Sequence, residues 1–126
     1  MKLILAVIRI AKMGETKQAL ADVGLPSFTA MPVLGRGQGR GDFSAKKVPA
    51  PILEDETMAL ASNTGSRLKP KRMITLVVKD DKKDLAIETI LKVNHTGESG
   101  DGKIFVVNTL GSYTVHSGLS GDETLD

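Results

Sequence analysis

The chain has 126 residues, a formal net charge of +2, only 3% aromatic residues and no cysteine. This length suits one domain, because two separate cores would each be too small to be stable without covalent staples. The absence of cysteine excludes disulfide bonds, cysteine-ligated zinc, iron–sulfur clusters and thiol catalysis. The small net charge does not argue for nucleic-acid binding, and the core must consist of aliphatic side chains.

The first half of the chain predicts a strand, a helix and a second strand. Residues 2–9 are almost continuously apolar, which is typical of a buried strand and too short for a signal peptide or a membrane span. Residues 15–23 carry apolar side chains at helical spacing, and Gly24 follows where a left-handed residue would end the helix. Residues 28–34 predict a strand that lies at a sheet edge or carries a bulge, because Pro32 cannot donate a hydrogen bond to a neighbouring strand.

The second half repeats this order of elements. Residues 72–78 are rich in β-branched side chains and predict a third strand. Residues 80–94 predict a helix capped by one of its two leading aspartates, and residues 104–107 predict a fourth strand. Because strand–helix–strand occurs twice, the predicted fold class is α+β, a ferredoxin-like βαββαβ sandwich formed by residues 1–126 as a single domain.

A long segment without periodicity joins the two halves. Residues 42–69 exceed the roughly 12–15 residues beyond which a structureless loop in a compact domain is usually functional or disordered. The segment nevertheless carries the apolar side chains Ile52, Leu53, Met58 and Leu60. It is interpreted as a loop that becomes ordered on a partner, and a flexible insertion is the alternative. Residues 118–126 predict a flexible acidic tail, and residues 113–115 a short additional strand.

Alternating glycines begin where the second strand is predicted to end. The run from Gly35 to Gly41 can turn backbone N–H groups toward an anion, and Arg36 and Arg40 add positive charge. A phosphate-binding loop is the favoured interpretation, with a merely flexible loop and an RNA-binding segment as alternatives. The RNA alternative is weak, because no aromatic side chain interrupts the run to stack on a base.

A second glycine-rich segment, residues 97–103, has the spacing of a Walker A loop without being one. Ile104 stands where Ser or Thr would hold Mg²⁺, and the predicted order is helix to strand rather than strand to helix. Glycine N–H groups and the Lys103 ammonium can still bind phosphate, although an ordinary glycine turn has the same pattern. His95 and His116 have no carboxylate at ligand spacing, and no paired carboxylates stand out, so the sequence offers no catalytic residue.

Together these segments resemble the nitrogen regulatory PII signal-transduction family over nearly the whole chain. The most specific part is residues 96–106, Thr-Gly-Glu-Ser-Gly-Asp-Gly-Lys-Ile-Phe-Val, which resembles the family's B-loop signature. Further support comes from the end of the first strand, the end of the first helix, the glycine run and the start of the third strand: Ile8-Arg9, residues 20–24, Gly35, Gly37 and Pro70-Lys71. The resemblance implies a trimer, in which residues 36–70 are the inserted T-loop that docks on targets and residues 96–103 are the B-loop.

The resemblance also implies ligands. ATP or ADP would bind between subunits, and 2-oxoglutarate would bind beside ATP through Mg²⁺. The implied nucleotide-binding residues are Thr29, Gly35, Arg36, Gly37, Gly100, Asp101, Gly102 and Lys103. The implied 2-oxoglutarate-binding residues are Gln38, Gly39, Gly41 and Lys71, with Lys71 pairing with a carboxylate and Gln38 as the Mg²⁺ ligand.

The chain departs from the family pattern at three places. The family's Mg²⁺-binding glutamine falls on Gly39, so Gln38 substitutes for it only if the loop shifts. Two phosphate-binding arginines of the family align with Thr114 and His116, which is expected to weaken triphosphate binding. The insert contains no tyrosine, so the uridylylation of many bacterial members is excluded.

Within the family, the chain is most similar to the subgroup encoded with nitrogenase genes, whose members act as pairs of different PII-like subunits. Residues 25–29, 33–37 and 93–97 resemble the second partner of such a pair. The resemblance implies a cytoplasmic regulator rather than an enzyme, in a homo- or heterotrimer with a related subunit, that inhibits nitrogenase until 2-oxoglutarate relieves it. It implies no nucleic-acid partner and no membrane insertion. The alternatives are a regulator of an ammonium transporter and a sensor of adenine nucleotide and bicarbonate.

Overall fold

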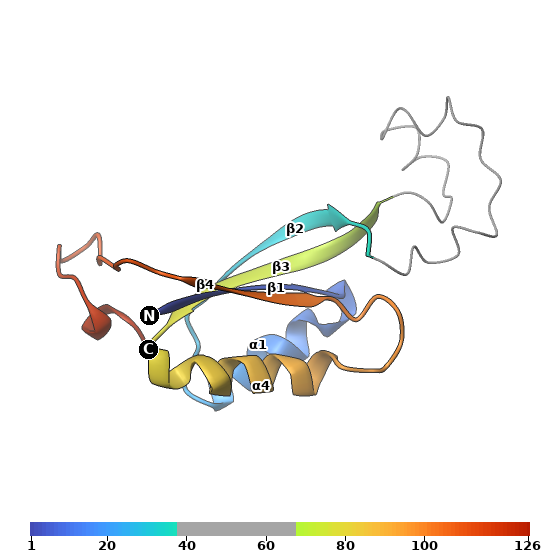
Figure 1. Ribbon diagram of the computed structural model, residues 1–126, viewed down its shortest axis with the longest axis horizontal. Helices are drawn as coiled ribbons and strands as arrows, with labels where there is room; N and C mark the ends of the chain where they lie inside the picture. The colour runs from blue at the N-terminus through green and yellow to red at the C-terminus, as the bar shows by residue number, and fades with distance from the viewer. Residues whose placement is uncertain (38–67) are drawn as a thin grey trace, which may run out of the picture.

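The computed structural model describes residues 1–37 and 68–126 (Figure 1). The predictions that fall on residues 38–67, among them most of the inserted loop, lie outside the described residues. The strands and α-helices are β1 (Lys2–Ile8), α1 (Met13–Asp22), β2 (Thr29–Gly35), β3 (Lys69–Val78), α4 (Lys83–Asn94) and β4 (Lys103–Asn108). Short 3-10 turns are η1 (Ile10–Lys12), η3 (Asp80–Lys82) and η4 (Asp122–Thr124).

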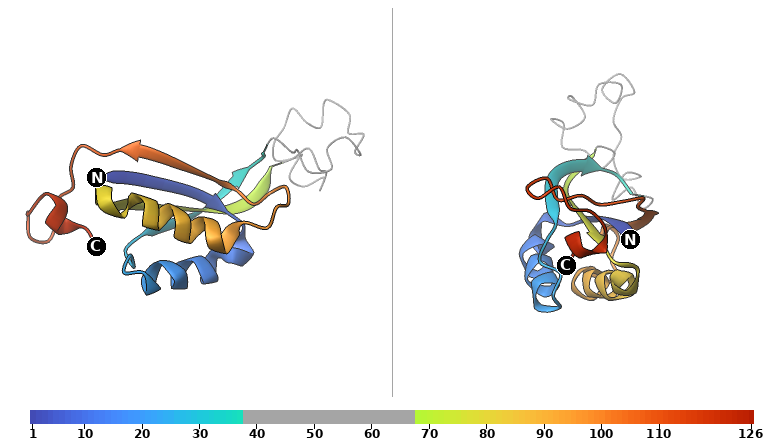
Figure 2. Two further views of the ribbon diagram at one scale, coloured as in Figure 1. Left: turned by 60° about the horizontal axis from the view of Figure 1, so that its bottom comes forward. Right: turned by 90° about the vertical axis from the view of Figure 1, so that its left-hand side faces the viewer.

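The strands form one antiparallel sheet in the order β2-β3-β1-β4. Helices α1 and α4 lie side by side on one face of this sheet, as both views of Figure 2 show. The predicted ferredoxin-like α+β fold is therefore confirmed. Of the two predicted alternatives for the strand of Pro32, a sheet edge or a bulge, the structure shows the edge, because β2 is the first strand of the sheet.

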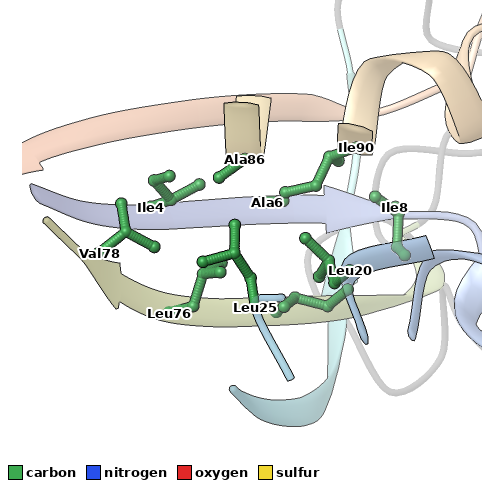
Figure 3. Packing of buried hydrophobic residues seen from close by; sticks show 10 residues of the cluster. Ile4, Ala6, Ile8, Leu20, Leu25, Leu76, Val78, Ala86 and Ile90 are labelled. Carbon is green, nitrogen blue, oxygen red and sulfur yellow. The ribbon is translucent and has the colours of Figure 1, made fainter. Parts of the chain in front are cut away.

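The core is aliphatic and lies between the sheet and the two helices (Figure 3). Alternate residues of β1 and β3 point toward the helices because successive side chains of a strand face opposite sides. The buried apolar side chains are Ile4, Ala6, Ile8, Leu20, Leu25, Ile74, Leu76, Val78, Ala86 and Ile90. Each buried Val, Leu or Ile contributes about 1.5–3 kcal/mol relative to exposure, so the chain forms a core without aromatic residues.

The end of α1 and the start of α4 are each formed by backbone hydrogen bonds, but of different kinds. Gly24 has φ 84°, and Leu25 N–H donates to the carbonyl of Leu20 at 2.8 Å, which is the predicted left-handed helix end. The predicted aspartate cap of the second helix is wrong, because no side chain caps η3 or α4. The 3-10 turn provides the N-terminal backbone bond instead, with Lys82 N–H donating to the carbonyl of Lys79 at 2.9 Å.

Several element bounds differ from the prediction because strand pairing extends beyond the apolar runs. β3 begins at Lys69 rather than at residue 72, since Lys69 pairs with Gly35 of β2. The last two residues of the predicted insert, residues 36–70, are thus part of the sheet.

Residues 118–126 fold back onto the domain in the structure, where the sequence predicts a flexible tail. Tyr113 pairs with Ser120 in a single antiparallel bridge in place of the predicted short strand. The hydroxyl groups of Ser112 and Thr124 lie 2.6 Å apart, and Gly121 N–H donates to the carbonyl of Ser112 at 3.0 Å. These local hydrogen bonds satisfy polar groups that the apolar pattern of the sequence does not report.

No helix of the described residues lies on the second face of the sheet (Figure 2), and only residues 124–126 of the C-terminal segment border it, at one end. The strand register places apolar side chains of all four strands on this open face: Leu3, Leu5, Val7, Met31, Met73, Val77, Phe105 and Val107. Met31, Phe105 and Val107 are 47%, 50% and 45% exposed. A contiguous apolar surface that is this exposed is typical of interaction sites in proteins.

Within residues 1–37 and 68–126, no helix is both long enough and apolar enough to cross a membrane.

Candidate functional site

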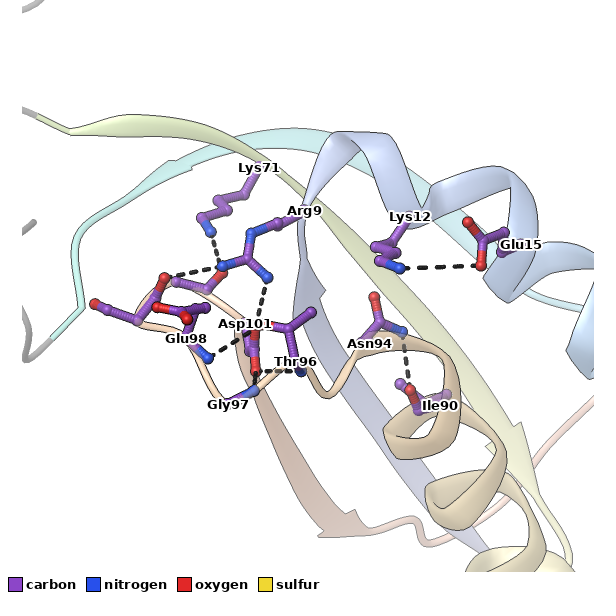
Figure 4. A network of polar contacts seen from close by, with 12 residues as sticks. Arg9, Lys12, Glu15, Lys71, Ile90, Asn94, Thr96, Gly97, Glu98 and Asp101 are labelled. Carbon is purple, nitrogen blue, oxygen red and sulfur yellow. Dashed lines mark hydrogen bonds and ion pairs between the residues drawn. The ribbon is translucent and has the colours of Figure 1, made fainter.

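A glycine loop, residues 96–102, connects α4 to β4 and is organised by the carboxylate of Asp101 (Figure 4). One oxygen of Asp101 accepts hydrogen bonds from the backbone N–H groups of Thr96 at 2.7 Å and Gly97 at 3.0 Å. The other oxygen accepts from the Thr96 hydroxyl group and from the guanidinium group of Arg9. The carboxylate therefore ties together both ends of the loop and the end of β1.

These partners determine the charge state of Asp101. Hydrogen bonds from the side chain and backbone of Thr96, then from Arg9, hold the pKa of the Asp101 carboxyl well below its usual range. The group is thus ionised throughout the physiological pH range. The side chain of Asp101 therefore organises the loop. Because a carboxylate repels phosphate, the predicted contact of Asp101 with a nucleotide would have to come from its backbone N–H group, and this contact stays a prediction.

Two cations from neighbouring strands hold the outer part of the glycine loop. Arg9 donates to the carbonyl of Ser99 at 2.9 Å, and the Lys71 ammonium donates to the carbonyl of Gly100 at 2.6 Å. Burial, then the charge of Arg9, lowers the pKa of Lys71. An ammonium group beside a second cation is a suitable place for an anion, because a bound anion neutralises their mutual repulsion.

Sequence reasoning missed Arg9 as a site residue. Arg9 follows β1, and the register Ile8–Arg72 places it beside the start of β3, where Lys71 lies. The only feature of the sequence that could have pointed to Arg9 is its position as a charged residue directly after the predicted first strand. It could not be used without the strand order, because its partner Asp101 belongs to another part of the sequence.

Gly102 lies so close to the backbone of β1 that no side chain can be accommodated at this position. A Cβ atom on Gly102 would lie 1.9 Å from the backbone oxygen of Val7, and the residue has φ 114°. Both the contact and the left-handed conformation require glycine. Lys103 consequently starts β4 directly against Val7 of β1, with its side chain exposed beside the loop.

A hollow of about 370 Å³ lies beside the glycine loop, between α4 and β4. Its walls include Ile87 and Leu91 of α4 and Ile104 of β4, and Lys103 and His95 line it as well. The loop therefore borders an apolar groove with basic side chains among its lining residues.

A second hollow of about 320 Å³ contains Thr29, at the beginning of β2. Phe28, Thr75 and Val77 also line it, as do residues 124–126 of the C-terminal segment. Thr29 therefore lies in a concave site of its own, apart from the glycine loop.

The structure brings some predicted site residues together and separates others. Gly100, Gly102, Lys103 and Lys71 gather at the glycine loop, together with the backbone of Asp101. Gly35 pairs with Lys69, two residues before Lys71, and Arg36 and Gly37 follow it at the same end of β2. The predicted ligand residues Gln38, Gly39 and Gly41 lie outside the described residues.

Thr29 is distant from the glycine loop within one chain. The residues Thr29, Thr75, Leu5 and Phe105 face one another in a row across β2, β3, β1 and β4. With strands about 4.8 Å apart, β2 and β4 are separated by about 14 Å. The C-terminal segment that carries Thr114 and His116 lies at the opposite end of the sheet from the glycine loop (Figures 1 and 2).

A metal site made of side chains has no candidate in the described part of the chain, where no three His, Asp or Glu residues gather closely enough to hold an ion.

Comparison with known proteins agrees with this arrangement. A family model described as nitrogen regulatory protein P-II matches residues 1–118. The chain is 41% identical over 126 residues to the "Nitrogen fixation nifHD region GlnB-like protein 2" of Methanothermobacter marburgensis, covering 99% of this chain and 100% of that protein. It is 38% identical over 125 residues to the "Nitrogen fixation nifHD1 region GlnB-like protein 2" of Methanosarcina barkeri, covering 99% of each. It is also 40% identical over 121 residues to a "GlnB-like protein 1" of the nifHD region of Methanococcus maripaludis, covering 96% and 99%.

Proposed function

Because the chain belongs to the nitrogen regulatory protein P-II family, we propose that it senses adenine nucleotide and 2-oxoglutarate and inhibits nitrogenase by direct binding. It acts in the cytoplasm as a regulator without catalytic activity of its own. Ligands bind at the base of the insert, residues 36–70, and bias which conformations of that segment dock on the target.

The observation that carries this proposal is the cluster of Lys71 and Lys103 around the glycine loop. The Lys71 ammonium donates a hydrogen bond to the loop at Gly100, and Lys103 is the first residue of β4, directly after the loop. Glycine N–H groups and ammonium groups are the donors that phosphate and carboxylate require. The residues therefore fit a nucleotide phosphate and a dicarboxylate side by side. If Mg²⁺ binds, Gln38 would be its protein ligand, and the ion would supply positive charge to neutralise the phosphate and carboxylate groups.

The separation of Thr29 from the glycine loop supports a site shared between subunits. Thr29 lies in one edge strand of the sheet and Lys103 in the other, so copies that turn their open faces toward a common axis, with the β2 edge of one beside the β4 edge of the next, bring the two residues together. The open apolar face of the sheet supplies the surface that such an assembly buries. We therefore propose a trimer, composed of this chain alone or with a related subunit that contributes the arginines missing at Thr114 and His116.

The relatives support nitrogenase as the target. Their names assign them to the nifHD region of nitrogen fixation, both as "protein 1" and as "protein 2". Methanococcus maripaludis has both forms, which is consistent with two different subunits acting together.

Calorimetry of the full-length protein tests the ligand part of the proposal. ATP and 2-oxoglutarate, titrated together with Mg²⁺, should bind more tightly than either ligand alone. Lys71→Ala should abolish the 2-oxoglutarate response while the mass of the oligomer in light scattering stays unchanged. Lys92→Ala, on the exposed side of α4, is the matched control and should respond like the wild type. If ATP and 2-oxoglutarate bound independently of each other, the proposal that the protein senses both ligands together would be refuted.

A separate experiment tests the target. Tagged protein should retain nitrogenase from an extract of nitrogen-fixing cells in the absence of 2-oxoglutarate and release it when 2-oxoglutarate is added. A variant in which a short glycine linker replaces residues 38–67 should retain none. Capture of nitrogenase by this variant would show that the insert is not the docking element, and capture of an ammonium transporter instead would replace the proposed target.

A further inference from the structure

The end of the C-terminal segment lies in the hollow that contains Thr29. Residues 124–126 form part of the lining of this hollow, together with Phe28 and the β3 residues Thr75 and Val77. Leu125 is partly buried there. The segment therefore limits access to this hollow.

Asp126 fastens this segment to the turn before β2. Its carboxylate oxygens accept hydrogen bonds from the backbone N–H group of Ser27 at 2.8 Å and from the Ser27 hydroxyl group at 2.9 Å. Both donors of Ser27 are thus directed at an internal anion, two residues before Thr29. A ligand that approaches Thr29 meets a negative charge instead of two free donors.

Internal hydrogen bonds keep the segment in this position. Thr124 contacts the Ser112 hydroxyl group at 2.6 Å and donates to the carbonyl of Gly121 at 2.7 Å. Leu125 N–H donates to the carbonyl of Asp122 at 3.0 Å. The two Asp126 contacts join this small folded unit to the turn before β2, so the unit can move away from the hollow as a whole, keeping its own hydrogen bonds, when these contacts open.

We infer that residues 124–126 form an autoinhibitory latch, and that closure of the latch on Ser27 and nucleotide binding at the Thr29 hollow exclude each other. The inference rests on the proposed nucleotide-sensing function and concerns the regulation of that site. An anionic nucleotide is repelled by the Asp126 carboxylate and gains the Ser27 donors only when the latch is open. The apparent affinity then equals the intrinsic affinity multiplied by the fraction of open molecules.

Titration of ADP by calorimetry into the full-length protein tests the latch. Asp126→Ala removes the contact with Ser27 and should bind ADP about 3–10-fold more tightly than the wild type, which corresponds to a latch that is closed in most molecules. Asp122→Ala is the matched control, because it removes an equal charge from η4 of the same segment without touching Ser27, and its affinity should equal that of the wild type.

Tyrosine fluorescence supplies a second readout. Tyr113 is the only tyrosine and the chain has no tryptophan, so intrinsic emission reports on the C-terminal segment alone. Tyrosine anisotropy should fall when ADP binds to the wild type, and it should already be lower in Asp126→Ala without ADP.

The outcomes separate the latch from the proposed function. Equal ADP affinity of the wild type and both variants, or weaker binding by Asp126→Ala, would overturn the latch and leave nucleotide sensing intact. Absence of ADP binding to all three proteins would overturn both. An equal gain in Asp122→Ala would show that only net charge matters and would also overturn the latch.

Discussion

Arg9 at the end of β1 forms an ion pair with Asp101 of the glycine loop, 92 residues later in the chain. This pair connects the central strand of the sheet to the loop that the family resemblance assigns to phosphate binding. The same carboxylate accepts hydrogen bonds from Thr96 and Gly97. The shape of the loop therefore depends on one ionised group.

We expect Asp101→Asn to lower the melting temperature at pH 7. The folded-state pKa of Asp101 is depressed by Thr96 and Arg9, so its contribution to stability is complete above the unfolded pKa of about 3.9 and is lost as the pH falls toward the lower folded value. Thermal unfolding of wild type and variant between pH 3 and 8 measures this. The difference should be constant above roughly pH 5 and should shrink below about pH 4. Asp122→Asn is the control, and identical unfolding of wild type and Asp101→Asn at pH 7 would contradict the assignment.

The Lys71 ammonium should titrate below the ordinary lysine value of about 10.4, because burial and the charge of Arg9 lower its pKa. The ¹³Cε resonance of Lys71, followed from pH 7 to 11, measures this. Arg9→Met removes the neighbouring charge and should move the Lys71 titration to higher pH. Affinity for a carboxylate ligand should fall as the pH rises through the depressed value. A Lys71 resonance that titrates at or above the ordinary value would disprove this electrostatic environment.

Gly102→Ala should destabilise the protein by more than about 2 kcal/mol, since the new methyl group meets the Val7 backbone and φ lies in the left-handed region. Urea unfolding followed by circular dichroism gives the free energy of unfolding. Gly14→Ala, in helix α1 with open space around its Cβ position, is the control and should be neutral or slightly stabilising. A Gly102→Ala variant as stable as the wild type would show that β1 and β4 separate without cost at this point.

A charge on the open sheet face should disrupt the proposed trimer. Phe105 is half exposed in the single chain and faces Leu5 of β1. Complete burial of a phenylalanine contributes about 1.5–3 kcal/mol, of which assembly can supply about half because Phe105 is already half buried, and Phe105→Asp replaces this gain with the cost of burying a carboxylate. Sedimentation velocity should show monomers for Phe105→Asp and an oligomer for Lys17→Glu on the helical layer. Wild-type sedimentation as a monomer at all concentrations would reject the assembly itself.

Local chemistry in the sequence was sufficient for much of the fold. Pro32 restricts its strand to a sheet edge or a bulge because it lacks an N–H group, and Gly24 marks the end of a helix. Apolar runs predict the strands and apolar residues at helical spacing predict the helices, so the two patterns together give the order of the elements. The error at the start of the second helix arose because aspartates at that position are compatible with both a side-chain cap and a 3-10 turn.

The site was less predictable because its contacts join distant parts of the chain. Arg9 shows no local pattern, and its role follows only from the register that places β1 between β3 and β4. Asp126 likewise depends on a partner, Ser27, that is 99 residues away. The glycine loop itself was recognisable because positive φ values at Gly97, Gly100 and Gly102 require a particular residue type at fixed spacing.

Gly35 and Lys69 face each other across β2 and β3, so the chain leaves the sheet and returns to it at one point. Insertions, deletions or complete exchange of the intervening residues change no strand register and no core contact among the described residues. Evolution can therefore vary the length and sequence of one segment of such a protein, while its sheet, its two helices and its glycine loop are inherited unchanged.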